Sequence, residues 1–322
     1  MVRRFNQMNS KNSSGPVIAA MPAHNEEETI GTIVLQALRH VDNVICVDDG
    51  SSDSSARIAK KSGAHVIHHR TNRGYGAALK SIFNYANEQN ASALVILDSD
   101  GQHDPSDIPK LLQPINSGDA DFVIGSRFID GGAGEEMPAY RRVGIKVITA
   151  ASNLSTDLDV KDTQSGFRAF SNRALRTIKF DQDGMESTLE MLEECKEFEL
   201  KVQEVPTVIR YDVPKGSRFT AVSHGFTVLS YALLSLSQKK PLIAFGLPGA
   251  GLLTLGSTIG MRALNNFNQF TGETLNMDLT VGPGLTAAWI SMFGISLIFT
   301  GFVLQGARTL LRRLIVRDFG IE

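Results

Sequence analysis

Two carboxylates one residue apart, Asp98 and Asp100, directly follow the apolar run from Ala93 to Leu97. The run predicts a buried strand, so both carboxylates would stand at its carboxyl end and reach one divalent cation. Gln102 adds a neutral oxygen, and Mg²⁺ or Mn²⁺ prefers oxygen ligands while keeping part of its shell for substrate phosphates. We therefore expect Asp98, Asp100 and Gln102 to hold a metal that neutralises a diphosphate leaving group.

Two other apolar runs also end in polar clusters. The run 17–21 leads into Pro22–Glu28, and the run 44–47 leads into Asp48–Asp53. An acidic side chain at such a strand end can accept hydrogen bonds from a nucleobase or a ribose. Polar clusters at three separate strand ends predict one ligand site at a shared edge of a sheet.

Short apolar strands alternate with amphipathic helices over the first half of the chain. Strands are expected at 17–21, 44–47, 66–67, 93–97 and 122–124, and helices at 27–39, 52–62 and 75–89. This alternation predicts an α/β fold with a mainly parallel sheet that helices cover on both faces. In such folds the ligand lies outside the carboxyl ends of the strands.

The C-terminal part contains two uncharged segments, 241–261 and 281–307, each long enough for a transmembrane helix. Basic residues flank the pair on its outer sides: Lys239, Lys240, Arg308, Arg312, Arg313 and Arg317. The positive-inside rule then places the preceding domain and the tail 308–322 in the cytoplasm, and the link 262–280 on the other side. Two buried helices of a soluble domain are the alternative. Glycines in both segments also suit packing between subunits of a homo-oligomer.

Residues 1–14 are polar and lack an apolar core, so they are expected to form a flexible tail rather than a signal peptide. Residues 219–240 are rich in apolar and small side chains. They are expected to form a juxtamembrane helix, either in the membrane interface or packed under the preceding domain. The formal net charge is −2, which excludes a global basic field for nucleic acid.

The polar clusters together resemble the family 2 inverting glycosyltransferases. The motifs are Pro-Ala-His-Asn-Glu-Glu at 22–27, Asp-Asp-Gly-Ser-Ser-Asp at 48–53 and Asp-Ser-Asp-Gly-Gln-His at 98–103. Gly-Ser-Arg at 125–127 and Asp-Thr-Gln-Ser-Gly-Phe-Arg at 162–168 narrow the resemblance to the branch of dolichyl-phosphate mannose synthase and bacterial polyprenyl-phosphate glucosyltransferases. The resemblance implies a GT-A fold for residues 15–218, followed by a two-helix transmembrane hairpin.

The resemblance also implies roles for individual residues. The residues that would bind the nucleotide sugar are Pro22, His24, Glu26, Val47, Asp49 and Asp98. Many relatives carry an aromatic residue where this chain has His24, which would either stack on the base or cap the strand. Asp98, Asp100 and Gln102 would hold the metal and the diphosphate.

A lipid phosphate acceptor would need cations, and arginine binds phosphate through two parallel hydrogen bonds. The candidates for the acceptor phosphate are Arg127, Arg141, Arg142, Arg168, Arg210, Lys215 and Arg218. Arg127 and Arg168 lie inside motifs, so they join Asp98, Asp100 and Asp162 in the expected catalytic set. Relatives often have Gly-x-Ser-Lys where this chain has Lys-Gly-Ser-Arg at 215–218.

Asp162 has three open roles: it orients the acceptor, acts as a weak base, or pairs with an arginine. A phosphate monoester is largely ionised near pH 7, because its second pKa is about 6. The acceptor therefore needs little base catalysis.

The resulting prediction is a metal-dependent inverting transferase in a cell membrane or an endoplasmic-reticulum-type membrane. It would move a hexose from UDP-glucose or GDP-mannose to dolichyl or undecaprenyl phosphate. UDP-N-acetylhexosamines remain open as donors. The alternatives are a transferase with another acceptor, as in polysaccharide synthesis, and a non-catalytic lipid-binding scaffold. The Gln-x-x-Arg-Trp motif of processive polymerases is absent, since Trp289 is the one tryptophan.

Overall fold

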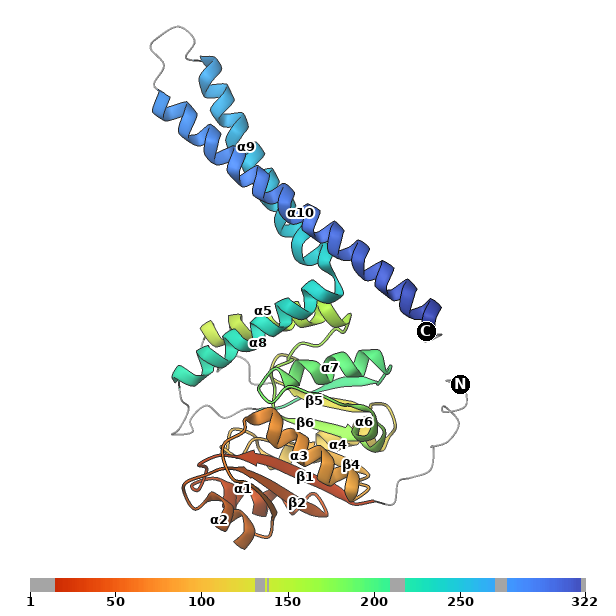
Figure 1. Ribbon diagram of the computed structural model, residues 1–322. Helices are drawn as coiled ribbons and strands as arrows, with labels where there is room; N and C mark the ends of the chain where they lie inside the picture. Colours follow the sequence, from red (N-terminus) through yellow and green to blue (C-terminus); the bar gives the residue numbers. More distant parts are fainter. Residues whose placement is uncertain (1–14, 131–136, 138, 209–217, 270–276, 320–322) are drawn as a thin grey trace. The chain divides into compact units, whose positions relative to one another are not determined.

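The structure is a computed structural model that describes residues 15–130, 137, 139–208, 218–269 and 277–319. The chain divides into two compact units between Ala232 and Leu233. The first unit contains a sheet with its helices, and the second contains a helical hairpin (Figure 1). The tail expected at 1–14 lies outside the described residues.

Within the described residues, seven strands form one sheet in the order β3-β2-β1-β4-β6-β5-β7. Neighbouring strands are parallel except for β6, which runs antiparallel to both β4 and β5. The strands span Val17–Ala23 (β1), Asn43–Asp49 (β2), His65–His69 (β3), Ala93–Ile96 (β4), Phe122–Ser126 (β5), Arg168–Ser171 (β6) and Val202–Pro206 (β7). The expected α/β fold with a mainly parallel sheet is confirmed.

The register of β6 matters for the site. Arg168, the first residue of β6, lies opposite Ile96, the last residue of β4. Because the two strands are antiparallel, the segment before β6 comes to the carboxyl end of β4. The motifs at 98–103 and 162–168 therefore meet at one edge of the sheet.

Helices cover both faces of the sheet, as the sequence predicts. Alternate residues of a strand point to opposite faces, so Ile18 and Ala20 of β1 share a core with α3, α6 and α7. Ala19 and Met21 share the other core with α1 and α4. The helices of this unit span Ile30–Ala37 (α1), Ser55–Lys61 (α2), Tyr75–Glu88 (α3), Pro105–Asp107 (η2), Ile108–Asn116 (α4), Ala139–Thr156 (α5), Asn172–Thr177 (α6) and Ser187–Glu197 (α7).

Helix α8 (Arg218–Lys239) covers most of the segment expected at 219–240. Val228 and Ala232 are each 1% exposed and belong to the core of the first unit. This part of α8 is therefore a packing helix, which was one of the two roles expected for it. Leu233 and Leu234, which follow, are exposed.

The second unit contains a π-helical turn (Leu242–Gly246, η4), α9 (Leu247–Gln269) and α10 (Met277–Phe319). Two stretches, Leu242–Asn266 and Gly282–Leu310, are long and apolar enough to cross a membrane. They overlap the segments expected at 241–261 and 281–307. Both helices run into the expected link 262–280, of which residues 270–276 lie outside the described part.

Glycines let α9 and α10 approach closely. A Cβ at Gly249 would meet the carbonyl oxygen of Gly294 at 2.6 Å, and one at Gly256 would meet that of Ala287 at 2.8 Å. Large apolar side chains on the outer surface of the hairpin are exposed, as Trp289 and Phe299 are at 67% and 68%. The hairpin thus packs through small residues and turns its large apolar ones outward, which suits a lipid environment.

Candidate active site

The carboxyl ends of β1, β2 and β4 lie side by side, because β1 pairs with β2 on one side and with β4 on the other. Ser99, in the loop after β4, donates its hydroxyl proton to the carbonyl of Pro22 at 2.8 Å. Thr29 donates to the carbonyl of Ser99 at 2.6 Å. These two bonds join the loops after β1 and β4, so polar clusters that are distant in sequence share one edge of the sheet.

The turn from Asp98 to His103 is held by its own backbone. The N–H of Gln102 donates to Asp100 at 2.9 Å, and Gly101 has a φ of +83°, which glycine adopts without steric cost. The N–H of Asp98 donates to Nδ1 of His103 at 3.0 Å. Burial lowers the pKa of His103 to about 4. The ring is therefore neutral near pH 7, with Nδ1 as its acceptor nitrogen.

Asp98 and Asp100 repel each other at this edge. Burial raises the pKa of Asp98 to about 6, although Arg168 and Arg127 counteract this, and the side chain keeps 34% of its surface exposed. Burial, followed by repulsion from Asp98, raises the pKa of Asp100. Both shifts show that the carboxylates lack full compensation for their negative charge.

A divalent cation fits this donor set, because Mg²⁺ and Mn²⁺ bind hard oxygen ligands and would relieve the repulsion. The described residues contain no group of three or more His, Cys, Asp or Glu side chains placed to hold a metal. A cation at Asp98 and Asp100 would therefore complete its shell with other oxygens, from Gln102, water or substrate phosphates.

The loop from Asp162 to Phe167 lies against the Asp98 carboxylate. At Gly166, a Cβ would meet Oδ2 of Asp98 at 2.7 Å and Oδ1 at 2.8 Å. Only a glycine allows this approach, because real side chains essentially never come so close. The loop thus forms one wall of the candidate site.

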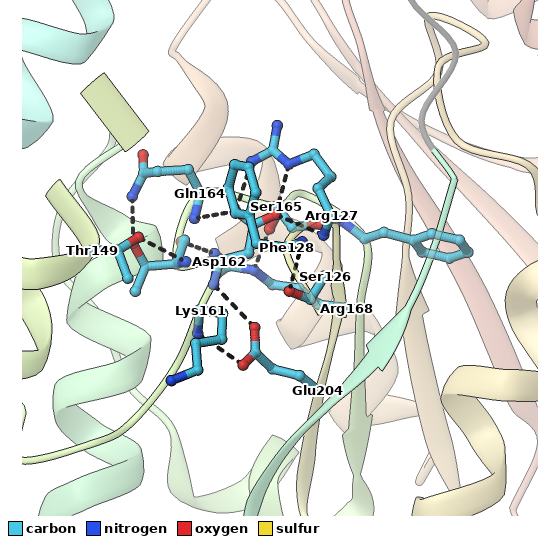
Figure 2. A network of polar contacts seen from close by, with 12 residues as sticks. Ser126, Arg127, Phe128, Thr149, Lys161, Asp162, Gln164, Ser165, Arg168 and Glu204 are labelled. Atoms are coloured by element: carbon cyan, nitrogen blue, oxygen red, sulfur yellow. Dashed lines mark hydrogen bonds and ion pairs between the residues drawn. The ribbon is translucent and has the colours of Figure 1, made fainter. Parts of the chain in front are cut away.

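Asp162 and Arg127 form a bidentate ion pair at this wall (Figure 2). Nε of Arg127 donates to Oδ2 of Asp162 at 2.6 Å, and Nη2 donates to Oδ1 at 2.7 Å. The backbone N–H of Arg127 donates to the same Oδ2 at 3.1 Å. The Asp162 side chain is 0% exposed. Of the three roles left open for Asp162, the geometry matches the pairing with an arginine.

Arg168 does not face the site as the sequence interpretation expected. Arg168 is 2% exposed, and its side chain donates to the carbonyls of two residues of the loop, Ser165 at 2.8 Å and Thr163 at 2.9 Å. It also donates to the carbonyl of Thr188 in α7 at 3.4 Å. The guanidinium therefore holds the loop in place, and burial keeps it away from an acceptor.

The candidate nucleoside residues lie around the end of β2. Asp49 accepts hydrogen bonds from Nδ1 of His69 at 2.7 Å and from the backbone N–H groups of Arg73 and Gly74 at 3.0 and 2.8 Å. Asp49 is 5% exposed, and its carboxylate is bound to the end of β3 and to the backbone before α3. It therefore holds the loop between these two elements in place. The exposed ring of His24 donates from Nδ1 to the carbonyl of Asp49 at 2.9 Å, which fits the capping role and leaves the stacking role open.

Val47 requires a correction, because its side chain is 0% exposed and packs in the core on the side of α3. Strand alternation turns it away from any surface, so its side chain does not line a pocket. Pro22 and Glu26 are half-buried at the end of β1. The backbone N–H of Glu26 donates to the hydroxyl of Ser55 at 2.7 Å.

The other basic candidates are only partly described. Arg142, in α5, donates to the carbonyl of Met137 at 3.3 Å. The side chains of Arg141 and Arg218 lie outside the described part of the structure, as do Arg210 and Lys215 entirely. Arg127 is thus the basic candidate for the acceptor phosphate whose setting the structure describes in most detail.

Sequence reasoning missed Glu204, a half-buried residue of β7. Its carboxylate accepts the backbone N–H groups of Lys161 at 2.8 Å and Asp162 at 3.0 Å. It also missed Thr149 of α5, whose hydroxyl lies 3.0 Å from that of Thr163. Neither residue belongs to a recognisable motif, and Glu204 is 42 residues from Asp162, so no local pattern points to them.

The chain matches the sequence profile of glycosyl transferase family 2 over residues 18–182. It is 34% identical over 242 residues to a UDP-N-acetylglucosamine–dolichyl-phosphate N-acetylglucosaminyltransferase of Methanococcus voltae, with 69% of this chain and 96% of that protein covered. It is 30% identical over 202 residues to a dolichol-phosphate mannosyltransferase of Pyrococcus furiosus, with 59% of this chain and 55% of that protein covered.

Among solved structures, the fold is similar to glucosyl-3-phosphoglycerate synthase from Mycobacterium tuberculosis in complex with Mn²⁺, uridine diphosphate and phosphoglyceric acid. The TM-score is 0.55 at 22% sequence identity, and the match covers 70% of this chain and 79% of the other. This likeness confirms the expected GT-A-type fold.

Proposed function

Because the chain belongs to glycosyl transferase family 2 and is a glycosyltransferase, we propose that it transfers a sugar from a nucleotide sugar to the phosphate of a polyprenyl lipid. The observation that carries this proposal is that the 162–168 loop contacts the Asp98 carboxylate at Gly166 and Arg127 at Asp162, which brings the Asp98–Asp100 pair and Arg127 to the same edge of the sheet. The carboxylates suit a cation that faces a diphosphate, and the arginine suits a second phosphate. The names of both curated relatives described above contain dolichyl or dolichol phosphate, which supports a lipid acceptor.

The chemistry proposed is a single displacement with inversion. The acceptor phosphate oxygen attacks the anomeric carbon from the side opposite the nucleotide diphosphate, and the sugar–diphosphate bond breaks. The phosphate is already ionised near pH 7, so no carboxylate has to remove a proton. Arg127 would orient the acceptor phosphate, and Asp162 would keep the guanidinium in one orientation. Most of the rate would come from positioning and charge stabilisation.

A divalent cation, when bound, would neutralise charge on the departing diphosphate. Asp98 and Asp100 would hold it, with Gln102 as a further oxygen ligand. His103 would keep Asp98 in position through the hydrogen bond that its Nδ1 accepts. Gly166 would keep the loop close to Asp98 without displacing the carboxylate.

The sugar donor is a finer part of the proposal. The branch resemblance favours a hexose, from UDP-glucose or GDP-mannose. The relative from Methanococcus voltae adds UDP-N-acetylglucosamine as a donor to be tested. Asp49 and His24 lie where the nucleoside is proposed to bind, so the base and the sugar have to be tested separately.

We also propose that α9 and α10 anchor the enzyme in a membrane, with the first unit and the C-terminus in the cytoplasm. Two long apolar helices support the anchor. Lys239, Lys240 and Arg308 to Arg317 flank them, and basic residues favour the cytoplasmic side. An anchor would raise the effective concentration of a lipid acceptor near the site.

A radiolabel transfer assay tests the proposal. Membranes containing the protein would receive polyprenyl phosphate, Mn²⁺ or Mg²⁺, and UDP-glucose, GDP-mannose or UDP-N-acetylglucosamine in turn. We expect label in the lipid phase with one donor, and its loss in Asp100→Ala. Asp119→Ala, an exposed carboxylate before β5, is the control and should keep the activity. Folded protein that transfers no label from any donor would overturn the proposal and favour another acceptor or a scaffold.

A further inference from the structure

We infer that Glu204 is a positioning residue that sets the orientation of Arg127 for the acceptor phosphate. Glu204 lies on β7, the strand at one edge of the sheet. The inference rests on the proposed function, because it takes the acceptor phosphate as the group that Arg127 binds. It adds a residue outside every motif to the machinery of acceptor binding.

The first step is the contact of Glu204 with the backbone. Its Oε2 accepts the N–H of Lys161 at 2.8 Å, and its Oε1 accepts the N–H of Asp162 at 3.0 Å. One carboxylate thus binds two consecutive backbone amides. Hydrogen bonds to an ionised acceptor are roughly twice as strong as neutral ones, so they fix the backbone at Asp162.

The second step leads from Asp162 to Arg127 (Figure 2). The Asp162 carboxylate accepts both side-chain and backbone N–H groups of Arg127, at 2.6 to 3.1 Å. The N–H of Gln164 also donates to it, at 3.3 Å. Because the Asp162 side chain is 0% exposed and that of Arg127 is 10% exposed, little room remains for another orientation.

The third step is the consequence for the guanidinium. Arginine binds phosphate well only when one edge of its planar guanidinium faces the phosphate oxygens. Because Nε and Nη2 of Arg127 each donate a hydrogen to Asp162, the acceptor phosphate would be bound by the other edge, the fork formed by Nη1 and Nη2. A small rotation of the backbone at Asp162 would turn its carboxylate and, with it, the fork of Arg127. Glu204 opposes that rotation because it binds the backbone N–H groups of Lys161 and Asp162, and so pre-organises the acceptor site.

The chain offers a matched control in Glu190 of α7. One oxygen of its carboxylate accepts the backbone N–H groups of Asp181 and Gln182, both at 3.0 Å. Glu190 therefore resembles Glu204, as a glutamate bound to two consecutive amides, but at a different loop. Replacing Glu204 by glutamine leaves one of its two amides without an acceptor, because each oxygen binds one amide. In Glu190→Gln the side-chain oxygen can accept both amides, so this variant controls for the loss of a negative charge at a loop that does not adjoin Asp162.

The experiment compares Glu204→Gln and Glu190→Gln in the chain of residues 1–322, each alone and combined with Arg127→Lys. Polyprenyl phosphate and the donor found active are varied separately. We expect Glu204→Gln to raise the KM for the lipid phosphate about tenfold, with the KM for the donor unchanged. In the Arg127→Lys background, Glu204→Gln should change the KM for the lipid phosphate less than about twofold, because Glu204 acts through the guanidinium that lysine lacks. Glu190→Gln should leave the lipid KM unchanged in both backgrounds.

Equal losses from Glu204→Gln in both backgrounds, or a parallel rise in the donor KM, would overturn the inference and reduce Glu204 to a structural role. Hydrogen exchange of the backbone provides a readout that needs no activity. The amide of Arg127, which donates to Asp162, should exchange faster in Glu204→Gln than in Glu190→Gln. An unchanged Arg127 amide overturns the inference even if the wild type transfers sugar. A wild type that transfers none defeats the proposed function instead.

Discussion

Gly166 lies so close to Asp98 that a Cβ on the glycine would stand 2.7 Å from one carboxylate oxygen and 2.8 Å from the other. The glycine and the aspartate belong to different motifs and meet only in the folded chain. The contact defines how near the 162–168 loop comes to the proposed metal site. Adding a single methyl group at residue 166 is therefore expected to displace the Asp98 carboxylate.

Gly166→Ala is therefore expected to displace the Asp98 carboxylate and to weaken Mn²⁺ binding at least about tenfold, as a ligand of a hard cation would move. Titration with Mn²⁺ detected by electron paramagnetic resonance measures this. Gly144→Ala in α5 is the control, since a Cβ there meets nothing within 4 Å. Equal Mn²⁺ affinity in both variants would contradict the close contact.

Asp98→Asn is expected to stabilise the metal-free protein near neutral pH. Burial raises the pKa of Asp98 from 3.8 to about 6, so the folded protein holds this proton more tightly than the unfolded chain. The contribution of Asp98 to stability is therefore fully present below the unfolded pKa and lost as pH rises through about 6. The melting temperature of Asp98→Asn should exceed that of the wild type at about pH 7.5, and this gain should shrink towards about pH 4. A gain independent of pH would refute this assignment.

The same pKa affects metal binding. Protons compete with a cation for Asp98 below about pH 6, so Mn²⁺ affinity should fall as pH decreases through that value. Equilibrium dialysis at several pH values measures the change. Constant affinity across the range would mean that Asp98 is not a ligand.

Asp162→Asn is expected to impair acceptor binding rather than proton transfer. The asparagine would lose the ionic part of the pair with Arg127, so the KM for the lipid phosphate should rise about tenfold. The pH profile of kcat should keep its shape, because the buried Asp162 is not expected to act as a base. A fall in kcat of more than about a hundredfold at unchanged KM would restore the role of a base.

Arg168→Lys is expected to destabilise the fold by about 3 kcal/mol, since a buried cation loses several of its partners. Its guanidinium reaches three carbonyls, those of Thr163, Ser165 and Thr188, and one ammonium cannot bind all of them in the same geometry. Chemical denaturation of the variant measures the loss. Unchanged stability with lost activity would instead place Arg168 in contact with substrate.

Gly256→Leu is expected to open the α9–α10 hairpin. A Cβ at Gly256 would meet the carbonyl oxygen of Ala287 at 2.8 Å and the backbone nitrogen of Ser291 at 2.9 Å, and a leucine adds more volume. Trp289, the one tryptophan, lies between these two residues of α10 and reports on the hairpin by its fluorescence in detergent. Gly251→Leu is the control, because a Cβ there meets nothing within 4 Å. Equal melting of the two variants would contradict the packing.

Local patterns in the sequence located five of the strands and both long apolar helices. Four of those strands contain an apolar run of three or more residues, as at 93–97 before Asp98, and β3 was located from Val66 and Ile67 alone. The patterns did not find β6 and β7. Strand β6 begins with Arg168, and β7 is only half-buried, so neither has the continuous apolar character of a central strand.

Side-chain roles were predicted less well than elements. Asp98 and Asp100 lie at the expected strand end, because residues that directly follow a strand must lie next to its carboxyl end. Val47 and Arg168 proved buried, since a motif shows that a residue matters but not which way its side chain points. Glu204 escaped notice because its partners are backbone amides, which carry no sequence signal.

The α/β alternation, the acidic residues after the strands and the two apolar helices follow from residues that are neighbours along the chain, so they can be predicted without the fold. The pairing of Asp162 with Arg127, the contact of Gly166 with Asp98 and the support of the loop by Glu204 exist only once the chain has folded. All three contacts depend on β6 lying antiparallel between β4 and β5. That strand order is set by the packing of the whole sheet against its helices, which no local pattern records.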